Sequence, residues 1–368
     1  MIRRVLRAFP VGETIAFFRE IGVGLHEEAG GKLFPDTNRA RDVLAALLRE
    51  SDRVGAKLFA GHRVIDVIPP RSETLQGRQE GRAKALRSDQ AQTATPHGFR
   101  IVTDRGEMTA GAVVLATGGQ SLPKSGSDGA GFAIARRLGH TIVPTTPALA
   151  PLLLAPADTI HAAVSGVSHD VELAVWVDGA VAIRLSGALL WTHFGISGPV
   201  ALNASRHWLR AQLEGRTVAM TANLRPGQQF GDVDDGWQRL VTANPKASVQ
   251  TTLASMLPAS VAAAMLRQLA LDGTSTLAHF SRDDRRRLSH ALVECPLPVT
   301  GSRGYTFAEA TAGGVALTEI DAGTMASRAC RGLSCVGEIL DVDGRIGGFN
   351  FQWAWASGFV AGRGLAAG

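Results

Sequence analysis

The sequence predicts an α/β protein, and three observations favour this fold class. The 368 residues are enough for about two domains with sizeable cores. Helical patterns alternate with glycines and short apolar strands along the first third of the chain. Two apolar segments, 112–116 and 333–336, are followed by Thr-Gly-Gly and by Gly-Glu, as expected of buried parallel strands that end in ligand-binding turns.

The first elements follow from the spacing of apolar residues. Apolar side chains at helical spacing predict a helix around 15–21 that ends at Gly22 and Gly24. A second helix is expected over 39–49, with Val43, Leu44, Leu47 and Leu48 on one face. Short strands are expected at 56–59, 62–68, 99–102 and 112–116, and Asp128 is placed to cap a helix that stops at Gly139.

Composition changes divide the chain into domains. Residues 69–98 are rich in charged and small polar side chains, so we expect a flexible excursion between two strands. Residues 147–303 have strands joined by the Asp178-Gly179 turn and then helical patterns from Ser248 to Val293. We therefore expect an inserted β-plus-helical domain at 147–303, between two parts of one α/β domain at 1–146 and 304–368.

Composition also excludes several classes of protein. Apolar residues make up 45% and charged residues 19%, which is unlike a disordered chain, and no apolar run is long enough to span a bilayer. The formal charge of +5 comes from scattered arginines, which do not favour a nucleic-acid partner. Three cysteines without a CxxC pair predict a cytoplasmic protein, and no cluster has metal-ligand spacing, so no metal is expected. We expect a small-molecule substrate, and the sequence gives no oligomeric state.

Two segments have the residues that nucleotide chemistry requires. One apolar strand ends in Thr117-Gly118-Gly119, where the backbone can approach a ligand closely, and the other is followed by Glu338, whose carboxylate can accept hydrogen bonds from sugar hydroxyls. Downstream, Gly347-Gly348 precedes a predicted helix whose free N–H groups and dipole favour negative charge. Small residues at 354, 358 and 362 predict close packing of this helix on a sheet.

Four motifs resemble a known family. The segments VVLATGGQSLPKSGSDGAGFAIARRLGH, THFGISGP, AEATAGGVALTEID and VGEILDVDGRIGGFNFQWAWASG are similar to those of bacterial FAD flavoproteins related to 3-dehydro-bile-acid Δ4,6-reductase, also described as aminoacetone-oxidase-like. The resemblance implies a glutathione-reductase-like FAD/NAD(P)-binding domain with an inserted domain. It also implies FAD as the cofactor, with NADH or NADPH as the candidate electron donor.

The resemblance implies a set of cofactor contacts. They are a backbone contact with adenine at Val64, the flavin-nucleotide turn at Thr117, Gly118 and Gly119, a ribityl or ribose contact at Glu338, and the helix start at Gly347, Gly348, Phe349 and Asn350, aimed at the flavin pyrimidine edge. Donors at that helix start would stabilise negative charge on a reduced flavin.

One departure from the family pattern concerns the start of the chain. No Gly-x-Gly-x-x-Gly turn occurs near Met1, and residues 3–9 already resemble the family's interior. We therefore expect the FAD domain to lack its first βαβ unit, with Met1 as an internal start, and to expose an apolar sheet edge beside 113–116. Translation of the upstream DNA would test this expectation.

Other candidate residues have two readings each. His193 is the candidate proton-handling group, and a structural role is the alternative. Ser197 is read as a helix N-cap rather than a nucleophile, and Cys330 and Cys335 as buried structural thiols rather than a redox pair. Trp353 and Trp355 are expected to pack in the core, with stacking near the isoalloxazine as the alternative. Asp341 and Asp343 are expected to shape the turn before Gly344.

The leading functional prediction is a flavin oxidoreductase that transfers a hydride through flavin N5 from a reduced pyridine nucleotide or organic donor to a small acceptor. One alternative is a truncated, non-catalytic fragment that cannot hold FAD. Another is a flavin-dependent tRNA-modifying enzyme, which would need a coherent basic face.

Overall fold

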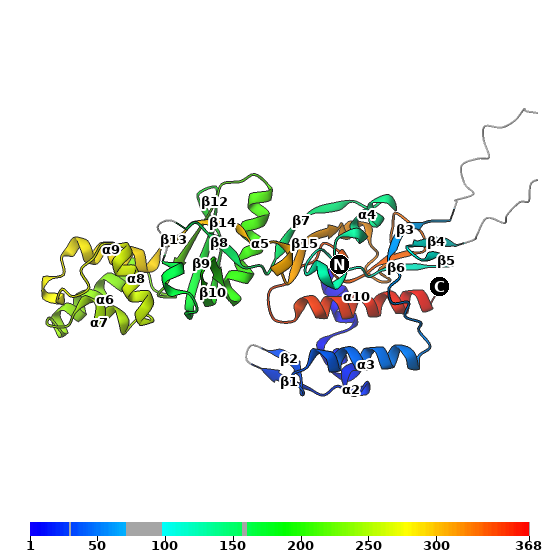
Figure 1. The fold of residues 1–368 in the computed structure, drawn as a ribbon, viewed down its shortest axis with the longest axis horizontal. Helices are drawn as coiled ribbons and strands as arrows, with labels where there is room; N and C mark the ends of the chain where they lie inside the picture. The colour runs from blue at the N-terminus through cyan, green and yellow to red at the C-terminus, as the bar shows by residue number, and fades with distance from the viewer. Residues whose placement is uncertain (29–30, 71–97, 157–159, 368) are drawn as a thin grey trace, which may run out of the picture.

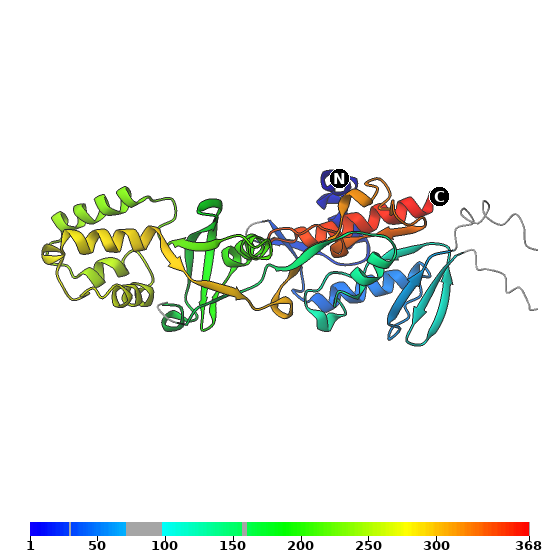
Figure 2. The same ribbon diagram turned by 90° about the horizontal axis from the view of Figure 1, so that it is seen from above.

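The computed structural model describes residues 1–28, 31–70, 98–156 and 160–367. Figures 1 and 2 show three parts in succession along the long axis: a helical block at one end, an antiparallel sheet in the middle, and an α/β part with both termini at the other end. Most of the expected excursion at 69–98 lies outside the described residues.

The middle part is a seven-stranded antiparallel sheet in the order β13-β12-β9-β10-β11-β8-β14. Its strands are β8 (Leu152–Leu154), β9 (Ser168–Val177), β10 (Ala180–Thr192), β11 (Gly195–Ser197), β12 (Val218–Asn223), β13 (Cys295–Leu297) and β14 (Val299–Ser302). The β9–β10 hairpin turns at Asp178 (φ 50°) and Gly179 (φ 81°), which confirms the turn expected from the Asp-Gly pair.

Helices pack on this sheet and form the helical block next to it. They are α5 (Pro199–Leu213), α6 (Phe230–Ala243), α7 (Val249–Ala254), α8 (Ala259–Gln268) and α9 (Arg282–Val293), with 3₁₀ turns η2 (His161–Val164) and η3 (Leu277–His279). One continuous apolar cluster runs from Leu152 to Val299 and includes the fully buried Trp191 and Trp237. The helical pattern expected over 248–293 is therefore confirmed.

The α/β part combines both ends of the chain. Its parallel pair is β6 (Val113–Leu115) with β16 (Leu333–Cys335), covered by α4 (Ala130–Arg137) and α10 (Phe349–Ala366), and α1 (Ile2–Ala8) packs on α10. Two further antiparallel sheets are β3-β4-β5 (Val64–Ile68, Phe99–Thr103, Gly106–Ala110) and β7-β15 (Ile142–Ala148, Ala310–Val315). The short 3₁₀ turns are η1 (Pro123–Ser125), η4 (Tyr305–Phe307), η5 (Leu317–Glu319) and η6 (Gly337–Ile339).

A small unit near the N-terminus packs beside α10. It consists of α2 (Val11–Glu20), β1 (Leu25–Glu28), β2 (Lys32–Pro35) and α3 (Ala40–Arg53), around Phe18, Val23 and Ala46. The indole of Trp355 contacts the ring of Phe18 edge-on at 5.4 Å, which joins this unit to α10. The helices expected around 15–21 and over 39–49 are therefore confirmed as α2 and α3.

Several local predictions are wrong. Residues 56–59 form no strand, and Leu58 and Phe59 are exposed, because no neighbouring strand is available to pair with them. On α3, Leu44 and Leu48 are exposed, and only the face with Val43 and Leu47 is partly buried.

The predicted packing of the last helix holds for Ala354, which lies against Gly337, but is wrong for the two glycines. Gly358 and Gly362 face solvent with nothing near the position of a Cβ, whereas Trp353, Ala356 and Val360 form the packed face. The buried apolar area determines which face of α10 turns toward the core, because burial of large apolar side chains contributes more free energy than close approach of glycines. Ser197 lies in β11 and does not cap α5, whose N-cap is Gly198.

Within the described ranges, no helix is long and apolar enough to cross a membrane. The mixed α/β architecture agrees with the predicted fold class. The domain boundaries at 146/147 and 303/304, and the glutathione-reductase-like subtype, stay predictions.

Candidate functional site

Glu338 is the centre of the candidate site. Its Oε1 accepts a hydrogen bond from the Thr311 N–H at 2.5 Å, and its Oε2 accepts one from the Gly119 N–H at 3.2 Å. Burial raises the pKa of the Glu338 carboxyl above its ordinary value, the nearby charge of Asp343 adds to the rise, and the two N–H donors oppose it. The carboxylate thus joins the ends of the strand pair to the strand β15.

The glycine turn after β6 lies directly beside this carboxylate. Gly118 has φ +69°, and a Cβ there would lie 2.8 Å from the Ser127 hydroxyl, while a Cβ on Gly119 would lie 2.4 Å from the Thr311 hydroxyl. The Thr311 Oγ1 also accepts hydrogen bonds from the N–H groups of the two residues after the turn, at 2.8 and 3.1 Å. Larger side chains are therefore excluded from the turn. We call Gly118, Gly119, Thr311 and Glu338 the carboxylate cradle.

A cavity of about 540 Å³ runs along β6 next to the cradle. It brings together Val64 and Thr117, which were singled out separately from the sequence, with Arg63, Val67, Ile101, Ala112, Val113, Val114, Leu115, Gly126, Asp128, Ala130, Gly131 and Ile134. The edge of β6 opposite β16 pairs with no strand among the described residues, and Val114 is 39% exposed. The expected exposed apolar edge is therefore present.

The wall of this cavity depends on one close helix–strand approach. A Cβ on Gly131, in the first turn of α4, would lie only 1.9 Å from the Thr117 hydroxyl. The Asp128 carboxylate accepts a hydrogen bond from the Ala130 N–H at 3.1 Å and pairs with Arg63, which lowers the pKa of Asp128. These contacts fix α4 against the end of β6.

The last helix begins where the sequence predicted, directly after the glycine pair, but the Asn350 side chain is engaged within the protein. Gly347 (φ 127°) and Gly348 (φ 84°) lead into α10, which begins at Phe349. The Asn350 Oδ1 accepts a hydrogen bond from the Gly344 N–H at 2.7 Å, so the side chain closes the preceding loop. Only backbone donors of this segment are left for a ligand.

Helix α10 also holds the strand that precedes Glu338. The Ser357 hydroxyl accepts a hydrogen bond from the Gly337 N–H at 2.9 Å, and the Trp353 indole donates to the Gly337 carbonyl at 3.0 Å. Trp353 is buried, as expected. Side chains of α10 therefore hydrogen-bond both the N–H and the carbonyl of Gly337, which fixes the backbone that precedes Glu338.

The loop before α10 is tied to the seven-stranded part. Asp343 is buried and pairs with Arg206 of α5, Nε to Oδ2, at 2.8 Å, and the Asn203 side chain accepts a hydrogen bond from the Ile346 N–H at 2.8 Å. Burial raises the pKa of Asp343, and the charge of Arg206 opposes the rise. The role expected for Asp343 in the turn is therefore replaced by an ion pair between distant segments.

The cradle fits the nucleotide cofactor that the sequence suggested. The Ser127 hydroxyl is buried beside Gly118 and has no hydrogen-bond partner among the described residues, so a polar ligand group can supply one. The Glu338 carboxylate has lone pairs left for sugar hydroxyls, and the cavity extends from Thr117 to Val64. A glycine-rich helix start for a pyrophosphate is not among the residues of this site.

His193 lies outside the cradle. It is exposed in the turn between β10 and β11, and its ring contacts Phe194 edge-on at 5.1 Å. On the far side of Phe194 lies Arg303, whose guanidinium carbon is 4.6 Å from the Phe194 ring centre and 3.4 Å from that of Phe307. A proton-handling role for His193 stays a prediction.

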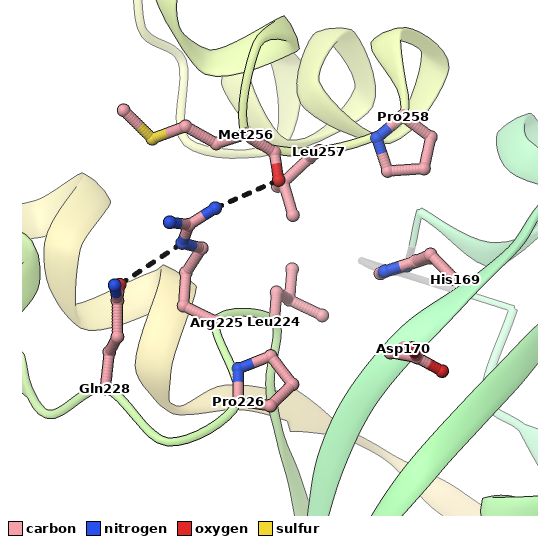
Figure 3. Close-up of a pocket in the computed structure, with 9 residues that line it drawn as sticks. All are labelled: His169, Asp170, Leu224, Arg225, Pro226, Gln228, Met256, Leu257 and Pro258. Carbon is pink, nitrogen blue, oxygen red and sulfur yellow. Dashed lines mark hydrogen bonds between the residues drawn. The ribbon is translucent and has the colours of Figure 1, made fainter.

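A second cavity, of about 390 Å³, lies between β9 and the helical block. Figure 3 shows His169 and Asp170 on one side and Arg225 on the other, where the guanidinium donates to Gln228 and to the Met256 carbonyl. Burial lowers the pKa of His169, whose Nε2 accepts a hydrogen bond from the Trp191 indole at 3.0 Å. These polar groups mainly join the sheet to the helices.

The cysteines are buried thiols. Burial raises the pKa of Cys335 to about 12 and that of Cys295 to about 11. A raised thiol pKa disfavours the nucleophilic thiolate, which agrees with the structural reading. In the part of the chain that the structure describes, no group of three His, Cys, Asp or Glu side chains is arranged to hold a metal.

Sequence reasoning missed four residues that matter here: Thr311, Ser127, Asp343 as an ion-pair partner, and Arg303. Thr311 and Ser127 lie inside motifs already quoted for the family resemblance, so their position in those motifs was the available signal. For Arg303, Phe307 four residues later was a weak local signal, whereas Phe194 comes from a distant turn.

Comparison with known proteins finds a matching family and similar enzymes. Residues 1–364 match the family described as HI0933-like protein Rossmann domain. The chain is 30% identical over 364 residues to a 3-dehydro-bile acid delta(4,6)-reductase of Clostridium scindens, covering 99% of this chain and 82% of the relative. It is 28% and 29% identical to ribosomal RNA dihydrouridine synthases of Haemophilus influenzae and Escherichia coli, covering 98% and 99% of this chain and 80% and 82% of those relatives.

Proposed function

Because this chain belongs to the HI0933-like protein Rossmann domain family, we propose that it is a flavin-dependent oxidoreductase that reduces a carbon–carbon double bond conjugated to a carbonyl group. The names of the relatives support this reaction class. A 3-dehydro-delta(4,6) steroid has two double bonds in conjugation with its 3-oxo group, and dihydrouridine is uridine with its ring double bond reduced. Both reactions add a hydride and a proton across such a bond.

The observation that carries the proposal is the carboxylate cradle. A half-buried Glu338 is held by two backbone donors, beside two glycines without room for side chains and a Ser127 hydroxyl that has no partner among the described residues. This combination supplies acceptors for sugar hydroxyls and a polar partner, next in sequence to residues that line the cavity. FAD is the proposed cofactor.

Each residue of the site has a proposed task. Glu338 and the turn Thr117-Gly118-Gly119 would hold the ribityl or ribose part, and Val64 would border the adenine. Backbone N–H groups at 347–350 would stabilise negative charge at the pyrimidine edge. The flavin, when bound, supplies hydride transfer, with NADH or NADPH as the proposed source of electrons.

A second candidate is reduction of a uridine in RNA, which two of the relatives' names favour. The arginine run of α9 does not supply a free basic face for it: Arg285 pairs with Asp234, Arg286 lies over the Phe230 ring, and Arg287 pairs with Asp284. The small-molecule substrate therefore stays the first candidate.

Spectroscopy on the purified protein tests the proposal. We expect yellow flavin absorbance, as purified or after addition of FAD, that bleaches anaerobically with NADH or NADPH and recovers with a conjugated enone. Glu338→Gln removes one acceptor from the cradle and should lower the flavin content. The control Glu107→Gln should leave the flavin content unchanged, because Glu107 is an exposed residue of β5 that pairs with Arg100. A protein that stays colourless with added FAD would contradict the proposal. A steroid enone and a uridine-containing oligonucleotide, assayed side by side, separate the two candidates.

A further inference from the structure

Arg303 has an arrangement that the proposed function does not use. It follows β14, and its backbone N–H donates to the Pro151 carbonyl at 3.0 Å. Its guanidinium carbon lies over two rings, 3.4 Å from the centre of Phe307 and 4.6 Å from the centre of Phe194. Contact of the cation with two aromatic faces restricts the side chain.

The edge of this guanidinium is unpaired. Two other partly buried arginines have carboxylate partners, since Arg206 pairs with Asp343 and Arg285 with Asp234, while Arg225 donates to Gln228 and to the Met256 carbonyl. For Arg303, no carboxylate of the described chain lies within ion-pairing distance, and its recorded side-chain contacts are the two rings. The N–H groups of a guanidinium match a carboxylate or a phosphate in a bidentate geometry.

Hydrogen bonds link the segment after Arg303 to the loop that follows the carboxylate cradle. The Leu122 N–H, three residues after Gly119, donates to the Tyr305 carbonyl at 3.0 Å, and the Tyr305 hydroxyl donates to Thr145 at 2.9 Å. Tyr305 begins the turn η4 that ends at Phe307, which is 46% exposed. One face of the Arg303 site is thus anchored to the loop that leaves the glycine turn.

We propose that Arg303, held against Phe194 and Phe307, binds an anionic carboxylate or phosphate of the substrate and orients it toward the cradle. The inference rests on the proposed function. It agrees with two relatives whose substrates are anions by name, a bile acid and an RNA. The rings make the arginine rigid, so little side-chain freedom is lost when the anion binds.

Binding of matched acid and neutral ligands tests the proposal without turnover. We would titrate the protein with a steroid enone carboxylic acid and with its methyl ester, and with a fluorescent uridine oligonucleotide against a methylphosphonate version. Wild-type protein should prefer an anionic form about ten- to a hundred-fold, as expected for a charge-assisted pair. A preference for the steroid acid over its methyl ester identifies a carboxylate as the anion. A preference for the oligonucleotide over its methylphosphonate version identifies a phosphate.

Arg303→Gln should abolish this preference and leave binding of the neutral form unchanged. Arg303→Lys keeps the positive charge but not the paired N–H donors of the guanidinium, so it should retain part of the preference for the anionic form. The matched control is Arg216→Gln, because Arg216 pairs with Asp178 at the distant end of the β9–β10 hairpin. Melting temperature and flavin content report whether the variants fold.

The outcomes separate the two proposals. If wild type shows no anion preference, or folded Arg303→Gln keeps it, the role of Arg303 is refuted. If the preference depends on Arg303 but the protein never reduces flavin or substrate, the anion site stands as a binding site and the proposed reaction fails.

Discussion

Removal of Arg206 gives the most direct test of how the site is held together. Arg206→Met keeps the length and apolar stem of the side chain but removes the charge that faces Asp343 at 2.8 Å. The Asp343 side chain is 9% exposed, and its Oδ2 has no hydrogen-bond donor of suitable geometry in the described part of the chain. The variant therefore leaves a buried carboxylate without its main compensating charge.

The expected loss depends on pH. Breaking a buried ion pair costs about 3–5 kcal/mol, and we expect about 3 kcal/mol at pH 7.5, because Arg206 keeps 30% of its side chain exposed. Toward low pH, as the Asp343 carboxyl takes up a proton, the loss falls toward that of the hydrogen bond from Arg206 to the Asp343 carbonyl, at 2.9 Å, which costs about 1 kcal/mol.

The sign follows from the raised pKa of Asp343. Below the unfolded pKa of 3.8, the carboxyl is neutral in both states and the buried charge costs nothing. As the pH rises through the raised folded pKa, the folded state loses stability. Without Arg206 this folded pKa rises further, so the loss is larger in the variant. Other charges near Asp343 are Arg210, Asp341 and Glu338.

Urea unfolding of wild type, Arg206→Met, Asp343→Asn and the double variant between pH 4.5 and 8 measures these differences. The double variant should recover most of the loss at pH 7.5, because no charge is left uncompensated. A loss that is the same at every pH, or a double variant as unstable as Arg206→Met, would refute the reasoning.

Three further predictions concern the same part of the molecule. Ser357→Ala leaves the buried Gly337 N–H without an acceptor and should cost about 1–3 kcal/mol in urea unfolding, together with lower flavin content; unchanged stability would contradict the assigned bond. Gly358→Ala, in open space on α10, should stabilise by about 0.5–1 kcal/mol, whereas Gly131→Ala should destabilise, and calorimetry on this matched pair would show opposite shifts in Tm if the geometry is right. Cys335, with a pKa of about 12, should react with a thiol reagent at pH 8 only after unfolding, and fast labelling of the native protein would be inconsistent with its burial.

Strongly patterned local signals were sufficient for many elements. The helices α2 and α3, the Asp178-Gly179 hairpin and the parallel strand β6 agree with predictions from apolar spacing and glycine positions. Predictions failed where packing overrides pattern. The stripe with Gly358 is exposed because larger side chains on another face of α10 bury more area.

The candidate site shows the same division. By itself, the sequence determined that two apolar strands end in a Thr-Gly-Gly turn and in Gly-Glu, and that a glycine pair precedes the last helix. Only the tertiary structure decided that Glu338 accepts hydrogen bonds from Gly119 and Thr311, which lie 219 and 27 residues away. It also decided that Arg303 contacts the rings of Phe194 and Phe307 and that Asp343 pairs with Arg206. The physical reason is that hydrogen bonds, ion pairs and ring contacts depend on distances across the fold, which the periodicity of one segment does not contain.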